Sequence, residues 1–229
     1  MSKGIFVTAT GTDIGKTFIS GLLVKKMRDY GLDCGYFKPA LSGAVKEPDG
    51  TLTPGDAKFV LETAGIKRHP KEVVSYIFEE AVSPHLAAER GGNLIYLDKI
   101  KNDFNRIKQD YDYLLTEGCG GIICPINLTD KKLLLEDIIK GLNHDVIIVA
   151  DGGLGTINST VLTVEYARSR GINVRGIILN NFDKNNFMHK DNLKQTENLT
   201  GIKVIATVEK NAKELDIDKS TLISIFKEI

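Results

Sequence analysis

A short loop ending in Gly-Lys-Thr follows the first apolar run of the chain, within FVTATGTDIGKTFIS at residues 6–20. The run before it, GIFVTA (4–9), has the character of a strand, and residues 16–31 after it have helical spacing. In such a unit the helix N-terminus holds phosphate oxygens, the lysine reaches the terminal phosphates and the threonine hydroxyl can bind Mg²⁺. A glycine-rich turn with an incidental lysine would not explain why strand, loop, Gly-Lys-Thr and helix coincide. The sequence therefore predicts a nucleotide-binding α/β protein.

The first half of this loop departs from the usual pattern G-x-x-x-x-G-K-[ST]. Thr10 stands where that pattern has its first glycine, with Ala9 and Gly11 on either side. Partitioning and septum-positioning ATPases have a related loop with an extra lysine, and Gly11 occupies the position of that lysine here. A lysine-dependent dimeric switch is therefore disfavoured.

Short apolar runs alternate with amphipathic stretches along the whole chain. Runs such as VIIVA and GIILN are apolar throughout, as strands buried on both faces of a parallel sheet require. The alternation predicts a single doubly wound, mostly parallel sheet with helices on both faces, of the P-loop NTPase type. No linker or repeat divides the sequence, so residues 1–229 are expected to form one α/β domain. The predicted strands are 4–9, 34–39, 73–78, 111–117, 145–150, 175–181 and 203–208, and the predicted helices are 16–31, 56–65, 97–111, 159–171 and 218–229.

Charge, apolar content and cysteine usage argue against several classes of partner. Lys+Arg and Asp+Glu both number 30, so no net charge favours nucleic acid or an anionic membrane. No apolar run reaches the roughly 18 residues that span a bilayer, and the N-terminus lacks a signal-peptide pattern, so a cytoplasmic location is expected. Cys34, Cys119 and Cys124 form no C-x-x-C pair, and they are interpreted as buried thiols in a reducing compartment.

A second lysine, Lys38, occurs in YFKPALSG. It is expected at the carboxyl end of a strand next to the first, where open α/β sheets bind ligands. Pro39 is expected to end that strand, and Ser42 to lie in the polar loop 41–55. An isolated lysine in an apolar strand is usually an edge residue whose ammonium reaches solvent. Two lysines at one phosphate site would instead neutralise the nucleotide and the group that accepts its phosphate.

Three acidic residues compete as ligands of Mg²⁺, which prefers carboxylate and phosphate oxygens. Asp56, in TPGDAKFV, is also explained as a helix N-cap. Glu117 ends an apolar strand before a glycine-rich turn, where the backbone can approach a ligand closely. Asp151 ends the most apolar strand, as the second acidic motif of many phosphate-loop enzymes does. These residues alone leave the choice open.

An ordered set of motifs resembles that of the dethiobiotin synthetases: T-G-T-D-I-G-K-T, F-K-P-A-L-S-G, G-D-A, S-P-H-L-A-A-E (83–89), E-G-C-G-G and L-G-T-I-N-S-T (154–160). The resemblance spans the chain and weakens after about residue 185. It implies an ATP- and Mg²⁺-dependent ligase of biotin biosynthesis, which closes the ureido ring of dethiobiotin from 7,8-diaminononanoate and CO₂ or bicarbonate. One amine would capture CO₂ as a carbamate, which would accept the γ-phosphate. The second amine would then attack this carbamic–phosphoric anhydride.

The resemblance also implies roles for individual residues. The catalytic residues would be Lys38, Lys16 and Thr12. The metal ligands would be Thr17, Asp56 and Glu117, which decides against Asp151. The substrate would be bound by Ser42, Thr156 and Asn158. The nucleotide would be bound by Asp13, Ile14, Gly15, Lys16, Thr17, Phe18, Asp56, Glu117, Gly118, Cys119, Gly120, Asn180, Asn181, Glu209, Lys210 and Asn211, of which Asn180 would read adenine.

The resemblance further implies a homodimer with shared active sites, in which the substrate carboxylate lies at a helix N-terminus across the interface. GTINST (155–160) would be that terminus, although Asn158 or Ser159 is explained equally well as a plain helix cap. The sequence departs from the family pattern at three places: Ala9 and Gly11 replace the usual Gly and Asp of the loop, Cys119 stands where alanine is common, and IATVEKN (205–211) lacks the proline of the segment G-E-I-P, which contacts adenine.

Two other functions stay as alternatives. One is a nucleotide-switch ATPase scaffold of the ParA and MinD kind, which would need a lysine at Gly11 and would show partner-stimulated hydrolysis. The other is the nucleotide domain of a cobyrinate-type amide synthetase. Such proteins usually carry a glutaminase domain as well, for which 229 residues leave no room.

Overall fold

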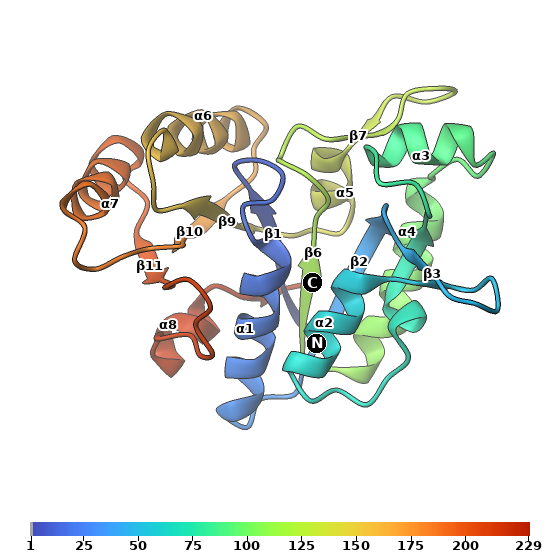
Figure 1. Cartoon of the computed structure of the whole chain (residues 1–229), viewed down its shortest axis with the longest axis horizontal. Helices are drawn as coiled ribbons and strands as arrows, with labels where there is room; N and C mark the ends of the chain where they lie inside the picture. The colour runs from blue at the N-terminus through green and yellow to red at the C-terminus, as the bar shows by residue number, and fades with distance from the viewer. Residues whose placement is uncertain (1) are drawn as a thin grey trace.

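An eight-stranded sheet runs through the centre of the molecule (Figure 1). The computed structural model describes residues 2–229. The strand order is β11-β10-β9-β1-β6-β2-β5, every neighbouring pair in this order is parallel, and β12 joins β1 in the antiparallel sense. The predicted doubly wound, mostly parallel sheet is confirmed. Its strands are β1 (Lys3–Ala9), β2 (Cys34–Leu41), β5 (Val74–Ile77), β6 (Tyr113–Glu117), β9 (Val146–Asp151), β10 (Val174–Asn180), β11 (Val204–Thr207) and β12 (Lys227–Glu228).

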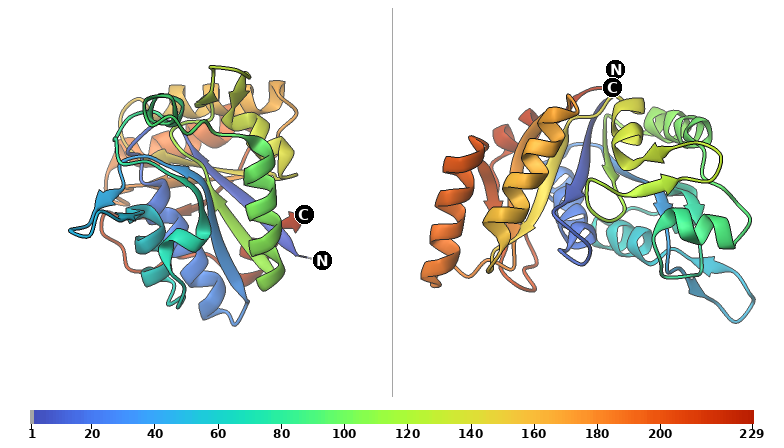
Figure 2. Two further views of the ribbon diagram at one scale, coloured as in Figure 1. Left: turned by 90° about the vertical axis from the view of Figure 1, so that its right-hand side faces the viewer. Right: turned by 90° about the horizontal axis from the view of Figure 1, so that it is seen from above.

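Helices cover both faces of this sheet. Side chains of α1, α2 and α8 pack on one face, and side chains of α3 to α7 pack on the other. Figure 2 shows α1 and α2 on one side of the strands and α4 on the opposite side. The helices are α1 (Lys16–Asp29), α2 (Gly55–Thr63), α3 (Pro84–Arg90), α4 (Leu97–Ile107), α5 (Leu135–Gly141), α6 (Thr156–Ser169), α7 (Phe187–Thr200) and α8 (Lys219–Ser224), with 3₁₀ turns η1 (Pro70–Val73) and η2 (Lys108–Asp110).

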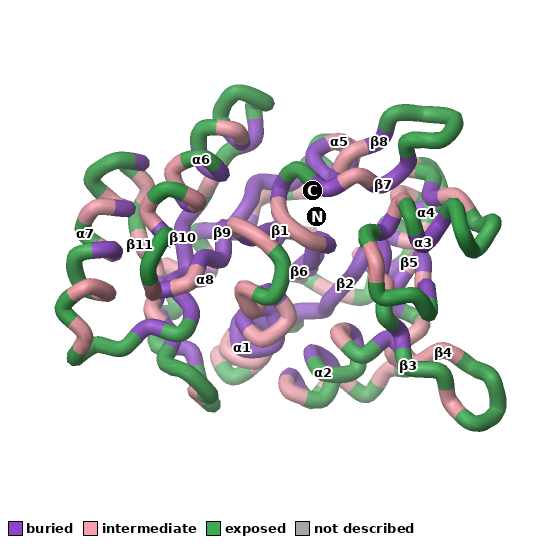
Figure 3. Tube along the Cα trace, turned by 45° about the horizontal axis from the view of Figure 1, so that its top comes forward, coloured by how far each residue is buried: buried purple, intermediate pink, exposed green. Residues whose placement is uncertain are grey.

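Two apolar cores follow from the alternation of side chains along each strand. In β9, Ile147 and Val149 face α1, whereas Ile148 and Ala150 face the opposite layer. Every residue of this strand except the last is buried, which explains why its sequence shows no polar alternation. Figure 3 shows the strands buried and the outer helix surfaces exposed.

All seven predicted strands are strands of this sheet, with ends that agree to within two residues. The expected neighbour of β1 is wrong, however: β6 lies between β1 and β2. Pro39 does not end β2, which continues to Leu41. Pairing with β6 stops at Phe37, and beyond it β2 pairs only with β5, so a residue without an N–H is tolerated there.

The helix predicted over 218–229 is wrong in its last part. α8 ends at Ser224 and the chain then forms β12, whose Lys227 lies opposite Gly4 of β1. β9 begins to pair with β1 only at Phe6, so the edge of β1 before that residue is free to accept β12. Figure 2 shows the two chain ends side by side, where the Ile229 N–H donates to the Ser2 carbonyl (3.1 Å).

Three helices, α3, α5 and α7, and two short hairpins were not predicted. α3 and α5 each have only seven residues. The buried face of α7 consists of Asn192, Thr196 and Thr200, so the helix lacks an apolar stripe. Helix α6 begins at Thr156, earlier than the predicted 159. The hairpins are β3 (Val45–Lys46) with β4 (Leu52–Thr53), inside the polar loop 41–55, and β7 (Pro125–Asn127) with β8 (Leu133–Leu134).

Within residues 2–229, every helix is too short or too polar to cross a membrane.

Candidate functional site

The phosphate loop joins β1 to α1 at the centre of the sheet. The Thr10 N–H donates to the Val149 carbonyl of β9 (3.0 Å), which fixes the start of the loop. Gly15 caps α1 with φ 97°, a left-handed conformation that disfavours any side chain. The ammonium of Lys16 lies back across the loop and donates to the Gly11 carbonyl (3.2 Å). Burial, together with the nearby charge of Lys38, lowers the pKa of Lys16.

Glu117 is the centre of the polar network beside this loop. It ends β6 directly opposite Val7 of β1, and it has no exposed surface. Its Oε1 accepts hydrogen bonds from Thr17 Oγ1 (2.7 Å) and Lys38 Nζ (2.6 Å). Its Oε2 accepts one from the Tyr36 hydroxyl (2.9 Å). Burial and the charge of Glu117 raise the pKa of Tyr36 well above its ordinary value, so the hydroxyl stays a donor.

Lys38 is not an edge residue with a solvated ammonium. It is only 3% exposed, and its Nζ lies 2.6 Å from Asp56 Oδ2 as well as 2.6 Å from Glu117 Oε1. Burial alone would lower the pKa of Lys38, but the charges of Glu117 and Asp56 outweigh this effect and raise it. The lysine is therefore held as a cation between two carboxylates.

Asp56 is not a helix N-cap. α2 begins at Gly55 with Pro54 in the capping position, so Asp56 lies in the first helical turn. There its carboxylate contacts Lys38 rather than the N-terminal N–H groups of its own helix. The helix thus presents an acidic side chain to the polar network formed by Lys38, Glu117 and Thr17.

These groups line a cavity of about 570 Å³ at the carboxyl ends of β1, β6 and β2. The rings of Phe18 and Phe59, with centroids 6.3 Å apart, form part of its wall. Its lining residues are Thr12, Asp13, Gly15, Lys16, Thr17, Phe18, Lys38, Ala40, Leu41, Ser42, Asp56, Phe59, Glu117, Gly118, Cys119 and Gly120. Thirteen of the residues implied by the motifs are thus brought together.

Sequence reasoning missed four residues of this region: Tyr36, Ala40, Leu41 and Phe59. Spacing could have indicated two of them. Tyr36 stands two residues before Lys38 on a strand, and Phe59 stands three residues after Asp56 on a helix, so each shares a face with its charged neighbour.

Asn180, at the end of β10, bridges the phosphate loop to the other half of the sheet. Its Nδ2 donates to the Ile14 carbonyl (2.9 Å), which ties the phosphate loop to the residue predicted to read adenine. Asn180 is 5% exposed, and its Oδ1 has no hydrogen-bond partner among residues 2–229. A buried acceptor without a donor costs stability, so a ligand donor would be favourable there.

Asp151 does not line the cavity. Its Oδ1 accepts from the Gly153 N–H (2.8 Å) and its Oδ2 from Asn181 Nδ2 (2.7 Å). The carboxylate therefore shapes the turn after β9, and Asn181 serves that turn too. Of the three candidate acids, Glu117 accepts a hydrogen bond from Thr17 and Asp56 forms an ion pair with Lys38. Asp151 contacts neither residue.

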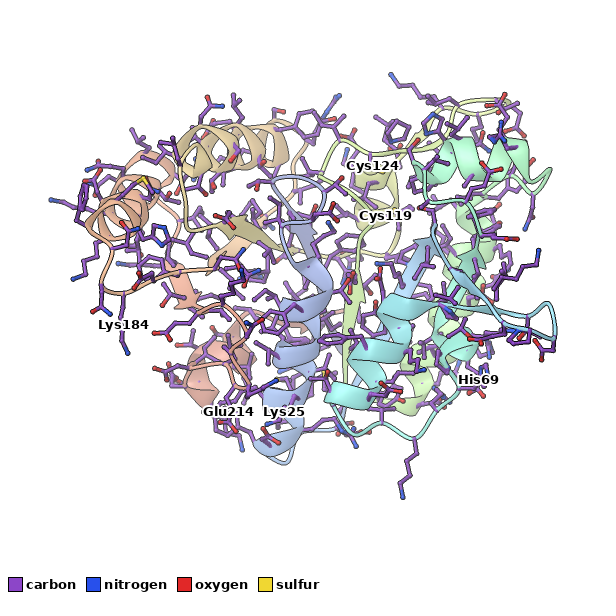
Figure 4. The ribbon with its side chains drawn as sticks, in the orientation of Figure 1. Lys25, His69, Cys119, Cys124, Lys184 and Glu214 are labelled. Carbon is purple, nitrogen blue, oxygen red and sulfur yellow. The ribbon has the colours of Figure 1, made fainter. Side chains whose placement is uncertain are left out.

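Glu209, Lys210 and Asn211 follow β11, and Glu209 lies on a second cavity of about 290 Å³. Phe182 and Val208 also line it. The Phe182 N–H donates to the Val208 carbonyl, and the Val208 N–H donates to the carbonyl of Leu179, the residue before Asn180. The second cavity therefore lies next to the end of β10. Figure 4 shows Lys184 and Glu214, both on this second cavity, well apart from Cys119 on the main one. Glu209 forms an ion pair with Lys184 (3.4 Å).

Thr156 and Asn158 lie in the first turn of α6, outside the main cavity. Thr156 is buried and its hydroxyl lies 3.4 Å from that of Thr160, whereas Asn158 is exposed. Gly155 caps the helix without a side-chain bond, so neither Asn158 nor Ser159 is the N-cap.

The three cysteines are buried and unpaired. Cys119 lines the main cavity, and Figure 4 shows Cys124 close to Cys119. A hydrogen bond with Cys124, and the charges of Lys38 and Lys16, lower the pKa of Cys119 despite its burial. The thiol adds a small polarisable group to the turn that follows Glu117.

The oxygen atoms around Lys38 suit a hard divalent cation. Thr17 supplies a hydroxyl, and Asp56 and Glu117 supply carboxylates. No cluster of three or more His, Cys, Asp or Glu ligands occurs in the described part of the chain. At nucleotide sites Mg²⁺ usually binds to only one or two protein carboxylates, and phosphate oxygens and water complete its coordination.

Known proteins resemble this chain over its full length. A family model described as an AAA domain matches residues 3–215. The ATP-dependent dethiobiotin synthetase BioD of Clostridium botulinum (strain 657 / Type Ba4) is 50% identical over 229 residues, 100% of both chains. The protein of the same name from Clostridium perfringens (strain 13 / Type A) is 51% identical over 210 residues, 92% of both chains.

Solved structures of other proteins share the architecture. The MinC:MinD cell division protein complex of Aquifex aeolicus has a TM-score of 0.57 at 14% identity, covering 93% of this chain and 83% of that one. A ParA family ATPase from Chlorobium tepidum TLS has a TM-score of 0.54 at 14% identity, covering 98% and 90%. At such identities the likeness shows the fold alone.

Proposed function

This chain belongs to the ATP-dependent dethiobiotin synthetase family, and from that membership we propose how its cavity carries out the family's reaction. It is an ATP-dependent ligase that makes dethiobiotin in biotin biosynthesis. The observation that carries the proposal is the meeting of Lys16, Lys38 and Glu117 around one cavity at the phosphate loop. The switch ATPases share this fold but have a lysine where Gly11 stands.

We propose 7,8-diaminononanoate and CO₂, taken up as such or from bicarbonate, as the other substrates. One amine bonds to CO₂ and releases a proton, which gives a carbamate. A carbamate oxygen then bonds to the γ-phosphorus while ADP leaves. The second amine attacks the carbonyl carbon, phosphate leaves, and the ureido ring closes.

The chain's own residues would lower the barrier chiefly by balancing charge. An anionic carbamate must approach an anionic phosphate, so cations fixed near both partners stabilise the transition state. We assign this task to Lys16, which crosses the phosphate loop, and to Lys38, which is held in place by two carboxylates. Thr12 and Ser42, on the same cavity, would orient the reacting groups.

We propose Thr17, Asp56 and Glu117 as the residues that hold Mg²⁺ with the nucleotide. The metal, when bound, would neutralise charge on the phosphate oxygens. Support comes from the contacts of these side chains: Lys38 bridges the carboxylates of Asp56 and Glu117, and the Thr17 hydroxyl donates to Glu117. Asp151 is left out because, unlike Asp56 and Glu117, it does not line the main cavity.

The nucleotide would run from the phosphate loop toward β10. Residues 13–18 and 118–120 would hold the phosphates, since all but Ile14 line the main cavity. We assign adenine to Asn180, whose buried Oδ1 lacks a donor and suits an exocyclic amino group. We propose that Asn181, Glu209, Lys210 and Asn211 border the base; Asn181 follows Asn180 directly, and Glu209 lines the second cavity.

We propose a homodimer in which α6 faces the partner subunit, with Thr156 and Asn158 contributing to the substrate's carboxylate site. Large apolar side chains are exposed on α6 and on nearby segments: Leu154 is 91%, Leu162 62%, Ile123 60% and Leu128 51% exposed. These belong to α6, its preceding loop and the region of β7, which lie along one side of the molecule in Figure 1. Sedimentation of Leu154→Asp/Leu162→Asp should show monomers where the unaltered chain dimerises; a monomeric unaltered chain would contradict the proposal.

We further infer that residues 1–229 act as one domain, because one sheet takes strands from β1 to β12. A reducing compartment such as the cytoplasm suits its three free cysteines.

The test of the proposed reaction is product formation by the purified chain. With 7,8-diaminononanoate, bicarbonate, ATP and Mg²⁺, dethiobiotin and ADP should appear in equal amounts. Omitting the diamine should abolish ADP release. ADP release that ignores the diamine and yields no dethiobiotin would contradict the proposal.

A further inference from the structure

Tyr36 is a polar side chain of the site region that the proposed reaction leaves without a task. It lies on β2 two residues before Lys38, so both side chains leave the strand on the same face. Opposite them on β6, Leu115 pairs with Tyr36, and Glu117 stands two residues further along that strand. Strand register thus brings the phenol up to Glu117 from within the apolar core.

The Tyr36 hydroxyl contacts the oxygen of Glu117 that faces away from the other donors. It donates to Oε2 at 2.9 Å, while Thr17 and Lys38 both contact Oε1. Tyr36 and Glu117 are both 0% exposed, so solvent does not compete for this bond. The two carboxylate oxygens therefore have different partners.

We infer that Tyr36 is a positioning residue, which holds the Glu117 carboxylate with Oε1 toward Thr17 so that this oxygen can bind the divalent cation of the nucleotide complex. The inference rests on the proposed function, because it takes Glu117 as a ligand of that cation. Without the hydroxyl, Oε2 of Glu117 would lack this donor, and the carboxylate could rotate about the Cγ–Cδ bond. Loss of a partner that orients a metal ligand typically weakens metal binding by about 10- to 100-fold.

The test measures the Kd for Mn²⁺ by electron paramagnetic resonance. It uses the whole chain with a non-hydrolysable ATP analogue bound. Tyr36→Phe should raise the Kd for Mn²⁺ by about tenfold or more. Tyr30→Phe is the matched control, since it removes a hydroxyl that donates to the Ile217 carbonyl (2.8 Å) far from Glu117. This control should bind Mn²⁺ as the unaltered chain does. A Kd for Tyr36→Phe equal to that of the unaltered chain would overturn the inference.

A second comparison separates positioning from a general loss of structure. In a Glu117→Gln background the buried charge is gone, so adding Tyr36→Phe should not weaken Mn²⁺ binding further. An equal loss in both backgrounds would show that Tyr36 does not act through Glu117 and would overturn the inference. Because the readout is metal binding, absence of dethiobiotin synthesis by the unaltered chain would contradict only the proposed function.

Discussion

A carboxylate without solvent contact is costly to the folded state unless donors surround it, and Glu117 is such a carboxylate. Its donors come from two different segments: Thr17 from α1, and Tyr36 and Lys38 from β2. The side chain therefore couples the phosphate loop to the neighbouring strands. Substitutions at these positions should change both the free energy of unfolding and the rate of turnover, and the ratio of the two effects should differ from one position to the next.

Lys38→Met should separate the two effects. The substitution keeps the volume of the side chain and removes its charge, so kcat should fall about 100-fold or more. Glu117 would also lose its buried counter-ion, which should lower the free energy of unfolding by about 3 kcal/mol. Steady-state ADP release and urea unfolding measure these two quantities.

The double variant Lys38→Met/Glu117→Gln is the control for Lys38. It removes both buried charges, so most of the lost stability should return while turnover stays low. Near-normal turnover of Lys38→Met would exclude the lysine from catalysis.

Glu117→Gln and Asp151→Asn distinguish the two competing acids. The Mg²⁺ concentration for half-maximal activity should rise at least about tenfold for Glu117→Gln, because a ligand charge is lost. It should hardly change for Asp151→Asn, whose oxygens contact Gly153 and Asn181 outside the cavity. A Mg²⁺ titration in which only Asp151→Asn responded would reverse the assignment.

The phosphate loop depends on one glycine for its shape and for its contact with β10. A Cβ added at Gly15 would lie 2.2 Å from Asn180 Nδ2, in a backbone with φ 97°. Gly50, in the β3–β4 hairpin, has φ 81° and nothing within 4 Å of such a Cβ. A side chain at either position would therefore strain the backbone, but only one at Gly15 would also collide with Asn180.

Gly15→Ala should weaken nucleotide binding at least about tenfold, because the loop must move away from Asn180. Gly50→Ala should leave binding unchanged and cost only about 1 kcal/mol of stability, from backbone strain alone. Calorimetric titration with ADP and urea unfolding would check both. Equal nucleotide affinities in the two variants would mean that the contact of Gly15 with Asn180 is unimportant.

The sequence predicted seven strands of the sheet because each is a mostly apolar run, as burial on both faces favours. It did not predict β12, which consists of Lys227 and Glu228. It did not predict α7, because the fully buried residues of that helix are the polar Asn192, Thr196 and Thr200 and give no apolar stripe. The place of β6 between β1 and β2 also escaped prediction, since strand order depends on contacts far apart in the chain.

The site was predicted where motifs mark it and missed where only geometry does. Lys38 and Glu117 could be proposed from their glycine-rich and proline-containing surroundings. The bond between them, and the role of Asp56 as partner of Lys38 rather than N-cap, depend on how α2 docks beside β2. Tyr36 has no motif, and strand alternation alone would have pointed to it.

His144 is expected to make the stability of the whole molecule depend on pH. It is buried, lies near Phe6 and Phe104, and has its Nε2 3.0 Å from Thr116 Oγ1. Burial lowers the pKa of His144 to about 3, from 6.5. Between these values the unfolded chain binds a proton that the folded chain does not, so acid favours unfolding.

The free energy of unfolding should therefore fall as the pH drops below about 6.5, by up to about 1.4 kcal/mol per pH unit from this residue. His144→Gln, which keeps a polar partner for Thr116, should show a shallower dependence between pH 7 and pH 5. Urea unfolding at a series of pH values measures it. Parallel curves for the two proteins would exclude His144 as the source.

The central place of β1 has a kinetic consequence. Its Val7 pairs with Glu117 and its Ala9 with Val149, so the strand that carries the phosphate loop finds its partners more than a hundred positions later in the chain. Contacts this distant form slowly, and the loop gains its shape only when they have formed. Nucleotide can therefore recognise the finished sheet but not its precursors. Added ADP should slow unfolding and leave the refolding rate unchanged.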